Sequence, residues 1–429
     1  MAAPTSRMRR LVGKAARPLF ERGLVSDWSG PPIGLNYWDG RRTEVGSGAA
    51  VAEVEFRCPS VFADMLISRS IGFGNAYADG RLDIDGDLQA VLRSVFSGSL
   101  LTGAPGAPWL LHRLRYPIQS LLRLRATANA RFHYDLGNEF FGKWLDSTMT
   151  YSCAYFQDEH DDLESAQRGK LDLICRKLSL QPDLRLLDVG CGWGSLLFHA
   201  IEHYGVHGVG VTPSREQAAW IRDEAKRRGI SSQLELQVAD WKSIRGSYDR
   251  VVSVGMFEHV GKAYGRSFLD HWRRWLKPQG VSVLHSIGAM TSCPPDPWIE
   301  QNIFPGGYLP SLSEIVNHVS RSGLMIADVE NLWRHYAITL QHWADNFAEA
   351  WRPLRRMTDE RFMRTWWLYL NASQAAFASG RCQLWQVVIT RDKLAPLPLT
   401  REGWLAGERK PRLRDRVEGE EPAGVHARS

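Results

Sequence analysis

The stretch LLDVGCGWG at residues 186–194 is an apolar run typical of a buried strand that leads into a tight glycine turn. Gly190, Gly192 and Gly194 allow the backbone to approach a ligand closely and to adopt conformations that a side chain would forbid. The residues that follow are typical of a helix. A strand, a glycine turn and a helix in this order predict one unit of an α/β fold, with a nucleotide-like cofactor at the turn.

Strand-like and helix-like segments alternate from about residue 183 to residue 390. Helical patterns occupy residues 214–228 and 264–277, for example. This alternation is typical of a doubly wound sheet with mostly parallel strands. The strand candidates are LRLLDV at 184–189, VHGVGV at 206–211, LELQV at 234–238, RVVSV at 250–254, VSVLHSI at 281–287 and LWQVVIT at 384–390, which we expect to complete the sheet.

The composition is that of an ordinary globular protein. At 429 residues the chain exceeds the roughly 100–200 residues of one domain, so we expect a catalytic core and at least one accessory region. No apolar run approaches the roughly 20 residues that a membrane-spanning helix needs, which excludes an integral membrane protein. The six cysteines are scattered without metal-ligand spacing. They predict no metal site and fit the reduced thiols of a cytosol.

We expect five parts along the chain, divided by composition. They are a basic amino-terminal arm (1–22), a small α+β accessory domain (23–100), a linker with a basic apolar segment (101–130), the catalytic domain (131–395) and a charged, disordered tail (396–429).

Positive charge is concentrated in two of these parts. Residues 1–22 and residues 109–131 each carry a net charge of +5, whereas the whole chain carries +6. The first segment is interpreted as an arm that binds an anionic membrane surface, with a targeting segment as the alternative. The second either lies on lipid or forms a linker helix packed on the core. No recognised module supports nucleic acid binding.

The spacing of the glycine turn separates two classes of cofactor. A dinucleotide site requires G-x-G-x-x-G and an acid after the second strand, and the chain has neither, so NAD is disfavoured. The spacing D-x-G-x-G-x-G resembles motif I of the class I S-adenosylmethionine-dependent methyltransferases. The resemblance implies their seven-stranded, mostly parallel sheet and S-adenosylmethionine as the co-substrate.

The resemblance also implies a set of cofactor-binding residues. Asp188 would orient the loop and the amino acid end of the cofactor. Hydroxyls and an amide would hold the ribose, and an acid and an indole after the third strand would hold the adenine, although core packing is the alternative for the indole. The predicted residues are Asp188, Gly190, Cys191, Gly192 and Gly194 in the turn, Thr212, Ser214 and Gln217 after the second strand, and Asp240 and Trp241 after the third.

Several blocks in the right order resemble the cyclopropane-fatty-acyl-phospholipid synthase and mycolic acid cyclopropane synthase family. They are HYDLGNEFF, MTYSCAYF, LLDVGCGWG, GVTPSREQ, MFEHVG, LKPQG, VLHSIG, NIFPGGYLPS and LWQVVIT. The segment AYADGRLDIDGDL also looks like the amino-terminal domain of longer bacterial members. The resemblance implies a role of that domain in lipid engagement or assembly.

The reaction that the resemblance implies begins with attack by a cis double bond of an unsaturated acyl chain on the sulfonium methyl group. Loss of a proton from the new methyl group closes a cyclopropane ring. A bound bicarbonate would accept that proton, because the acyl chain carries no base. Phe141, Tyr264 and Tyr308 are candidates to line an acyl tunnel, with core packing as an equal alternative.

The bicarbonate site of the family corresponds to five residues that all match: Cys153, Glu258, His285, Ile287 and Tyr336. Backbone amides near Cys153 and Ile287 would help to hold the anion. Tyr151 and Ser152 match contacts to the cofactor from the substrate side. Ser373, in LNAS, is the sixth candidate catalytic residue. Many relatives have an active-site cysteine there, and the serine leaves room for an altered substrate or product.

The implied partners are unsaturated phospholipid acyl chains and an anionic membrane surface, and the implied place is the cytoplasm, peripherally at the membrane. A homodimer is one option for the assembly. Three other functions stay open. They are methylation of a lipid without ring closure, methylation of a small-molecule amine, and non-catalytic binding of lipid or cofactor.

Overall fold

The computed structural model describes residues 6–97 and 137–405. The chain forms two compact units, the first ending at Ala395 and the second beginning at Pro396. The second contains the short helix α18 (Glu402–Leu405). The linker predicted at 101–130 lies outside the described residues, and so does the part of the predicted tail from residue 406 onward.

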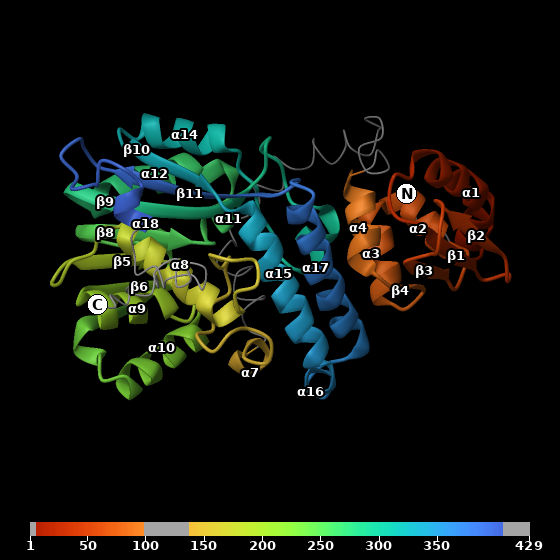
Figure 1. The fold of residues 1–429 in the computed structure, drawn as a ribbon, viewed down its shortest axis with the longest axis horizontal. Helices are drawn as coiled ribbons and strands as arrows, with labels where there is room; N and C mark the ends of the chain where they lie inside the picture. The colour runs from red at the N-terminus through yellow and green to blue at the C-terminus, as the bar shows by residue number, and fades with distance from the viewer. Residues whose placement is uncertain (1–5, 98–136, 406–429) are drawn as a thin grey trace, which may run out of the picture. The chain divides into compact units, whose positions relative to one another are not determined.

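Strands within residues 185–390 of the larger unit form a seven-stranded sheet (Figure 1). Its strand order is β10-β11-β9-β8-β5-β6-β7, and β11 alone runs antiparallel to its two neighbours. The predicted doubly wound, mostly parallel α/β fold is therefore confirmed. The strands are β5 (Arg185–Val189), β6 (His207–Thr212), β7 (Leu234–Val238), β8 (Tyr248–Val254), β9 (Leu276–Gly288), β10 (Met325–Asn331) and β11 (Gln383–Thr390).

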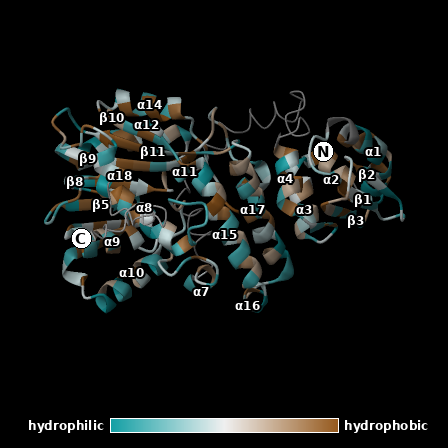
Figure 2. Ribbon diagram, viewed as in Figure 1, coloured by the Kyte–Doolittle hydropathy of each residue, from teal (hydrophilic) through white to brown (hydrophobic). Residues whose placement is uncertain are grey.

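Helices cover this sheet because its central strands are apolar. Every residue of β11 is buried, and this strand is mostly brown in Figure 2. Helix α8 packs beside α9, and α12 packs beside α14. The longer helices are α8 (Leu163–Lys177), α9 (Ser195–Tyr204), α10 (Arg215–Arg227), α12 (Gly265–Trp275), α14 (Leu312–Arg321), α15 (Trp333–Glu349) and α17 (Glu360–Ala378). The shorter ones are α7 (Asn138–Phe141), α11 (Phe257–Val260), α13 (Pro297–Asn302) and α16 (Trp351–Arg355).

A second, four-stranded sheet lies in the amino-terminal part of the chain, with the order β2-β1-β3-β4. Its core contains a cluster of aromatic rings, of which Phe56 and Phe62 have centroids 4.6 Å apart. The elements are α1 (Ser6–Asp27), β1 (Ile33–Tyr37), β2 (Arg42–Val45), β3 (Ala52–Phe56), α2 (Ser60–Ser68), α3 (Ser70–Ala78), β4 (Leu82–Gly86) and α4 (Leu88–Ser97). They form the smaller α+β region that the sequence predicts.

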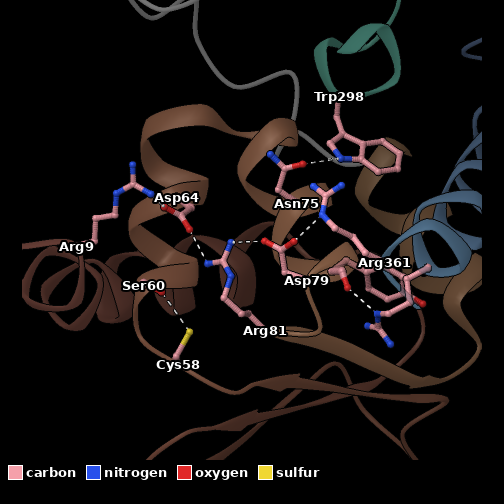
Figure 3. Close-up of polar contacts among 11 residues, drawn as sticks. Arg9, Cys58, Ser60, Asp64, Asn75, Asp79, Arg81, Trp298 and Arg361 are labelled. Carbon is pink, nitrogen blue, oxygen red and sulfur yellow. Dashed lines mark hydrogen bonds and ion pairs between the residues drawn. The ribbon is translucent and has the colours of Figure 1, made fainter. Parts of the chain in front are cut away.

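The basic segment at 1–22 differs from the separate arm that we predicted. Residues 6–27 form α1, which packs against α2, so the predicted boundary at residue 22 falls inside a helix. Ala16 and Leu24 are buried on its inner face. Arg9 pairs with Asp64 at 3.3 Å, as Figure 3 shows. This apolar stripe at helical spacing explains why the segment folds onto the domain.

Helix α17 joins the amino-terminal elements to the large sheet, because it packs against α3 and α4 as well as α15. Arg361, on its first turn, pairs with Asp79 at 2.8 Å (Figure 3). The indole Nε1 of Trp298 on α13 donates to Asn75 Oδ1 at 3.3 Å. Only glycine fits at position 74, since a Cβ there would lie 2.4 Å from that indole nitrogen.

Candidate active site

The glycine turn lies at the carboxyl end of β5, between this strand and α9. The amides of Gly190 and Cys191 both donate to the carbonyl of Val211 on β6, at 2.9 and 3.1 Å. A Cβ at position 190 would lie 2.7 Å from Met256 Cγ, so only glycine fits against the loop after β8. The φ angles are +84° at Gly190, +54° at Gly192 and +84° at Gly194.

A cavity opens beside this turn, at the edge where ligands bind in open α/β sheets. Gly194, the N-cap residue of α9, is not among the residues that line it. The other predicted cofactor-binding residues all line it: Tyr151, Ser152, Asp188, Gly190, Cys191, Gly192, Thr212, Ser214, Gln217, Asp240 and Trp241. The fold thus brings them together, while their individual roles stay predictions.

Asp188 and Lys170 give the cavity its two buried charges. Their exposed fractions are 3% and 1%. Burial raises the pKa of Asp188 to about 7, and the charge of Lys170 opposes that rise. Burial lowers the pKa of Lys170 to about 8. Lys170 was not predicted from the sequence, although a lysine that interrupts the apolar stripe of α8 is a signal for it.

The polar residues after β6 form a small network of hydrogen bonds. Thr212 Oγ1 lies 2.8 Å from Gln217 Oε1, and Ser214 Oγ caps α10 by accepting from the amide of Gln217. The Nε2 of Gln217 is buried and has no partner among the described residues. It is therefore the donor that a ligand in the cavity could use.

Asp240 and Trp241 lie after β7, and each has a structural contact as well as a place on the cavity wall. The carboxylate of Asp240 accepts from the amide of Lys242 at 2.9 Å. The indole of Trp241 packs edge-on against Phe268, with centroids 5.2 Å apart. Core packing and cofactor contact, the two alternatives for Trp241, are therefore compatible.

The segment around Tyr151 is held from two helices. The hydroxyls of Tyr151 and Tyr369 lie 2.7 Å apart, which connects the segment to α17. On α8, Lys170 Nζ donates to Ser152 Oγ at 2.7 Å, and Gln167 Nε2 donates to the carbonyl of Ser152 at 2.8 Å. Tyr369 and Gln167 were not predicted from the sequence, because tertiary contacts alone place them here.

Glu258 and Ile287 form one pair of the predicted catalytic residues. The amide of Ile287 on β9 donates to Glu258 Oε1. We had expected this amide to hold an anion, but it is already bonded and is not free to do so. Glu258 Oε2 is buried and makes no hydrogen bond of good geometry among the described residues, although the Ser286 side chain lies close enough to lower the pKa of the carboxyl. Burial raises the pKa of Glu258 to about 7, so the carboxyl is partly protonated near neutral pH.

His285 lies two residues before Ile287 on β9, and alternate residues of a strand share a face. Its Nδ1 is 3.2 Å from Gln386 Nε2 on β11. Its Nε2 is buried without a partner among the described residues. Burial, together with the charges of Lys170 and Lys177, lowers the pKa of His285 well below its ordinary value, so the ring is neutral.

Cys153 and Tyr336 both contact Leu332, at the beginning of α15. Cys153 Sγ lies 3.9 Å from the carbonyl of Leu332, which also accepts from the amide of Tyr336 at 3.1 Å. Burial raises the pKa of Cys153 far above its ordinary value, so it remains a thiol. The Tyr336 ring packs on Phe377 with centroids 4.6 Å apart.

Ser373 lies on α17, one turn after Tyr369, and is half-buried. It therefore faces the same side of the helix as the tyrosine that contacts Tyr151. Within residues 6–97 and 137–405, no contact of its side chain explains why serine stands here.

The charge of Lys170 affects two of the predicted catalytic residues, because it lowers the pKa of both Cys153 and His285. None of the six predicted catalytic residues lines the cofactor cavity in the described part of the chain. The aromatic residues proposed for an acyl tunnel are dispersed. Phe141 packs on Trp193, Tyr264 lies under Lys242 Nζ, and the Tyr308 hydroxyl donates to Glu314.

Comparison with known proteins assigns the family. A family model described as mycolic acid cyclopropane synthetase matches residues 123–387. The chain belongs to this family. A second model, described only as a domain of unknown function, matches residues 22–102.

Members of the family match over most of the chain. The cyclopropane-fatty-acyl-phospholipid synthase of Escherichia coli K12 is 39% identical over 80% of this chain and 89% of its own length. The tuberculostearic acid methyltransferase UfaA1 of Mycobacterium tuberculosis is 34% identical over 84% of this chain and 88% of its own.

Solved structures of the family agree with this assignment. The mycolic acid cyclopropane synthase CmaA1, in complex with SAH and CTAB, is 33% identical with a TM-score of 0.59, over 62% of this chain and 98% of its own. The predicted membership, the class I methyltransferase fold and the use of S-adenosylmethionine are thereby confirmed. This cyclopropane synthetase family member is an S-adenosylmethionine-dependent methyltransferase.

Proposed function

We propose that the chain transfers the methyl group of S-adenosylmethionine to the cis double bond of a phospholipid acyl chain and closes a cyclopropane ring. The π bond attacks the sulfonium methyl carbon, and the carbon–sulfur bond breaks to release S-adenosylhomocysteine. The resulting carbocation loses a proton from the new methyl group. The electron pair of that carbon–hydrogen bond closes the ring.

The observation that carries this proposal is a pair of buried polar atoms, Glu258 Oε2 and His285 Nε2, that lack partners among the described residues. Buried polar groups are nearly always hydrogen-bonded, so each of these atoms is a candidate to bind a polar ligand. Glu258 is bonded to the amide of Ile287, two residues after His285 on β9. A carboxyl with a pKa of about 7 and a neutral imidazole can both donate to an oxyanion. Bound bicarbonate fits this donor set and would supply the base for proton removal.

The residues of the chain have separate tasks in this scheme. The glycine turn and the polar groups after β6 and β7 hold the methyl donor. Tyr151 and Ser152, held by Tyr369 and Lys170, line that cavity and directly precede Cys153 in the sequence. Exclusion of water from the reacting carbons would protect the carbocation, and any aromatic face in contact with it would stabilise it by about 0.5–2 kcal/mol.

Removal of bicarbonate tests this scheme in the purified protein. With S-adenosylmethionine and vesicles of unsaturated phospholipid, turnover should fall in bicarbonate-free buffer and return when bicarbonate is restored. Glu258→Gln should show no such recovery. Equal turnover with and without bicarbonate would remove the anion from the mechanism.

Methylation of the acyl chain without ring closure is the second candidate. Ser373 and the 34% identity with a tuberculostearic acid methyltransferase favour it. The same carbocation forms, and the product differs in which proton leaves or whether a hydride arrives. Methylation of an amine or simple binding is less well supported, because neither requires buried, unpartnered Glu258 and His285.

A peripheral place on an anionic membrane, reached from the cytoplasm, completes the proposal. Among the described residues, no helix is long and apolar enough to cross a bilayer. The outer face of α1 exposes apolar side chains between bases, and the end of α2 exposes two more, which is the composition of a helix that lies on lipid. These residues are Met8, Leu11, Val12 and Leu19 with Arg7, Arg10 and Lys14, and then Leu66 and Ile67.

A further inference from the structure

A chain of four buried or half-buried polar side chains runs from β10 through the end of α8 to His285. Lys177 Nζ donates both to Glu330 Oε2 and to Gln386 Oε1. Gln386 Nε2 in turn lies 3.2 Å from His285 Nδ1. Gln386 is fully buried, and Lys177 and His285 are exposed by only 2% and 1%.

The cross-strand registers hold this arrangement in place. Gln386 on β11 pairs directly with His285 on β9, and Glu330 on β10 pairs directly with Gln386. Side chains at directly opposite positions lie close enough to interact. Lys177, at the end of α8, contacts both Gln386 on β11 and Glu330 on β10.

Lys177 decides which way the Gln386 amide points. An ammonium group has donors and no acceptor, so it requires the amide oxygen opposite it. The reversed amide would place two donors face to face in a buried site, which is costly. The amide NH₂ of Gln386 therefore points to His285 Nδ1.

We propose that Lys177 and Gln386 are positioning residues that fix one tautomer of His285, with its proton on Nε2. Nδ1 must accept from the Gln386 NH₂, and a neutral imidazole has one N–H, so the proton lies on the other nitrogen. That nitrogen is the buried atom without a partner among the described residues.

This inference rests on the proposed function and sharpens it. In this tautomer His285 donates a hydrogen bond to the bound oxyanion and cannot take a proton through Nε2. The proton lost from the methyl group therefore passes to the anion and not to His285. Burial and the two lysine charges lower the pKa of His285, which keeps the ring neutral.

The tautomer can be measured in the full chain without any substrate. In a protein labelled with ¹⁵N-histidine, NMR distinguishes the two tautomers, and the His285 signals are those that disappear in His285→Asn. We expect the Nε2–H tautomer. An Nδ1–H tautomer, or a charged ring near neutral pH, would overturn the inference whether or not the enzyme makes a cyclopropane.

Gln386→Glu tests the positioning role, because a carboxylate keeps the contact with Lys177 and accepts from Nδ1. We expect the proton to move to Nδ1 and kcat to fall at least tenfold, with an unchanged KM for S-adenosylmethionine. Gln383→Glu on the same strand is the matched control, since Gln383 bonds to Gly380 and Asn331 and not to His285. It should keep the wild-type tautomer and turnover.

Two further outcomes separate this inference from the proposed function. Loss of turnover in Gln386→Glu with an unmoved proton would refute the positioning role alone. A wild-type Nε2–H tautomer with no alkylated lipid product would leave the tautomer established and refute the proposed function. Lys177→Arg should retain the wild-type signal, whereas Lys177→Met should lose the single tautomer.

Discussion

At the scale of single residues, buried ionisable groups distinguish this site. Glu258 has a pKa raised to about 7 by burial, whereas the same carboxyl titrates near 4.5 when exposed. The folded state therefore binds more protons than the unfolded state between these two values. This group stabilises the fold at low pH, and its contribution is lost as the pH rises from about 4.5 to 7.

Glu258→Gln removes this titration, which gives a prediction for stability. The free energy of unfolding of the variant, relative to wild type, should rise by up to about 3 kcal/mol between pH 4.5 and pH 7.5. Denaturant titrations of both proteins at the two pH values measure it. A constant difference would mean that the carboxyl is ionised in the folded protein at both values.

The same variant should lose turnover while it retains the cofactor. Because Glu258 does not line the cofactor cavity, we expect kcat to fall by about a hundredfold or more with little change in the affinity for S-adenosylmethionine. Calorimetric binding and turnover assays separate the two quantities. Unchanged turnover would remove Glu258 from the mechanism.

Lys170 carries a prediction about cofactor binding. Lys170→Met removes the charge that opposes the raised pKa of Asp188, so that pKa should rise further. If ionised Asp188 holds the cofactor, the midpoint of the pH dependence of S-adenosylmethionine binding should move to higher pH. Lys226→Met, at an exposed position on α10, is the control. Identical midpoints in all three proteins would exclude the coupling.

At the scale of elements, the sequence predicts what periodicity can show. The six strand candidates are all strands of the large sheet, because their runs are apolar and bounded by turns. Strand β10 was missed, since its residues are mostly half-exposed and carry no clear alternation. The helix predicted at 264–277 ends earlier than expected, at Trp275, because β9 begins at the next residue.

Some residues of the candidate site could be predicted from the sequence and others could not. Residues inside motifs could be predicted, and the fold gathers almost all of the predicted cofactor residues at one cavity. A lysine in the apolar stripe of α8 is a sequence signal for Lys170, but it does not show what Lys170 contacts. Gln167, Tyr369, Lys177 and Gln386 could not be predicted. The contacts of all five residues span 15 to 218 positions in the chain. Tertiary contact, rather than local pattern, gives these residues their place.

Helix α1 has two faces, which changes the test of membrane binding. Deletion of residues 1–22 would remove the buried Ala16 and disrupt the domain. The double variant Arg10→Glu and Lys14→Glu alters the outer face alone, and we expect weaker binding to anionic vesicles, with the largest loss at low salt.

Sedimentation with vesicles at two salt concentrations measures this effect. The matched control is Arg222→Glu with Lys226→Glu, which makes the same change of charge on exposed positions of α10. Equal binding by the two double variants would show that net charge, and not the α1 surface, is responsible.

At the scale of the whole molecule, Arg364 on α17 ties the amino-terminal elements to the large sheet's helices. Its guanidinium donates to the carbonyls of Tyr77 and Leu82 at 2.7 and 3.0 Å and to Asp83 at 3.0 Å. Arg364→Ala should destabilise the protein by about 2–3 kcal/mol. Arg361→Ala, which removes an exposed ion pair with Asp79, should cost less than about 1 kcal/mol. Equal losses in thermal unfolding would contradict this distinction.

The lipids of cells that express the chain provide the decisive test of the proposed reaction. Mass spectrometry of acyl chains from cells with the wild type should show unsaturated chains that gain one methylene and resist mild hydrogenation, as a ring does. Cells with Glu258→Gln should lack this product. A gain of one methylene that hydrogenation reduces, a saturated methyl branch, or no gain at all in the wild type would contradict ring formation.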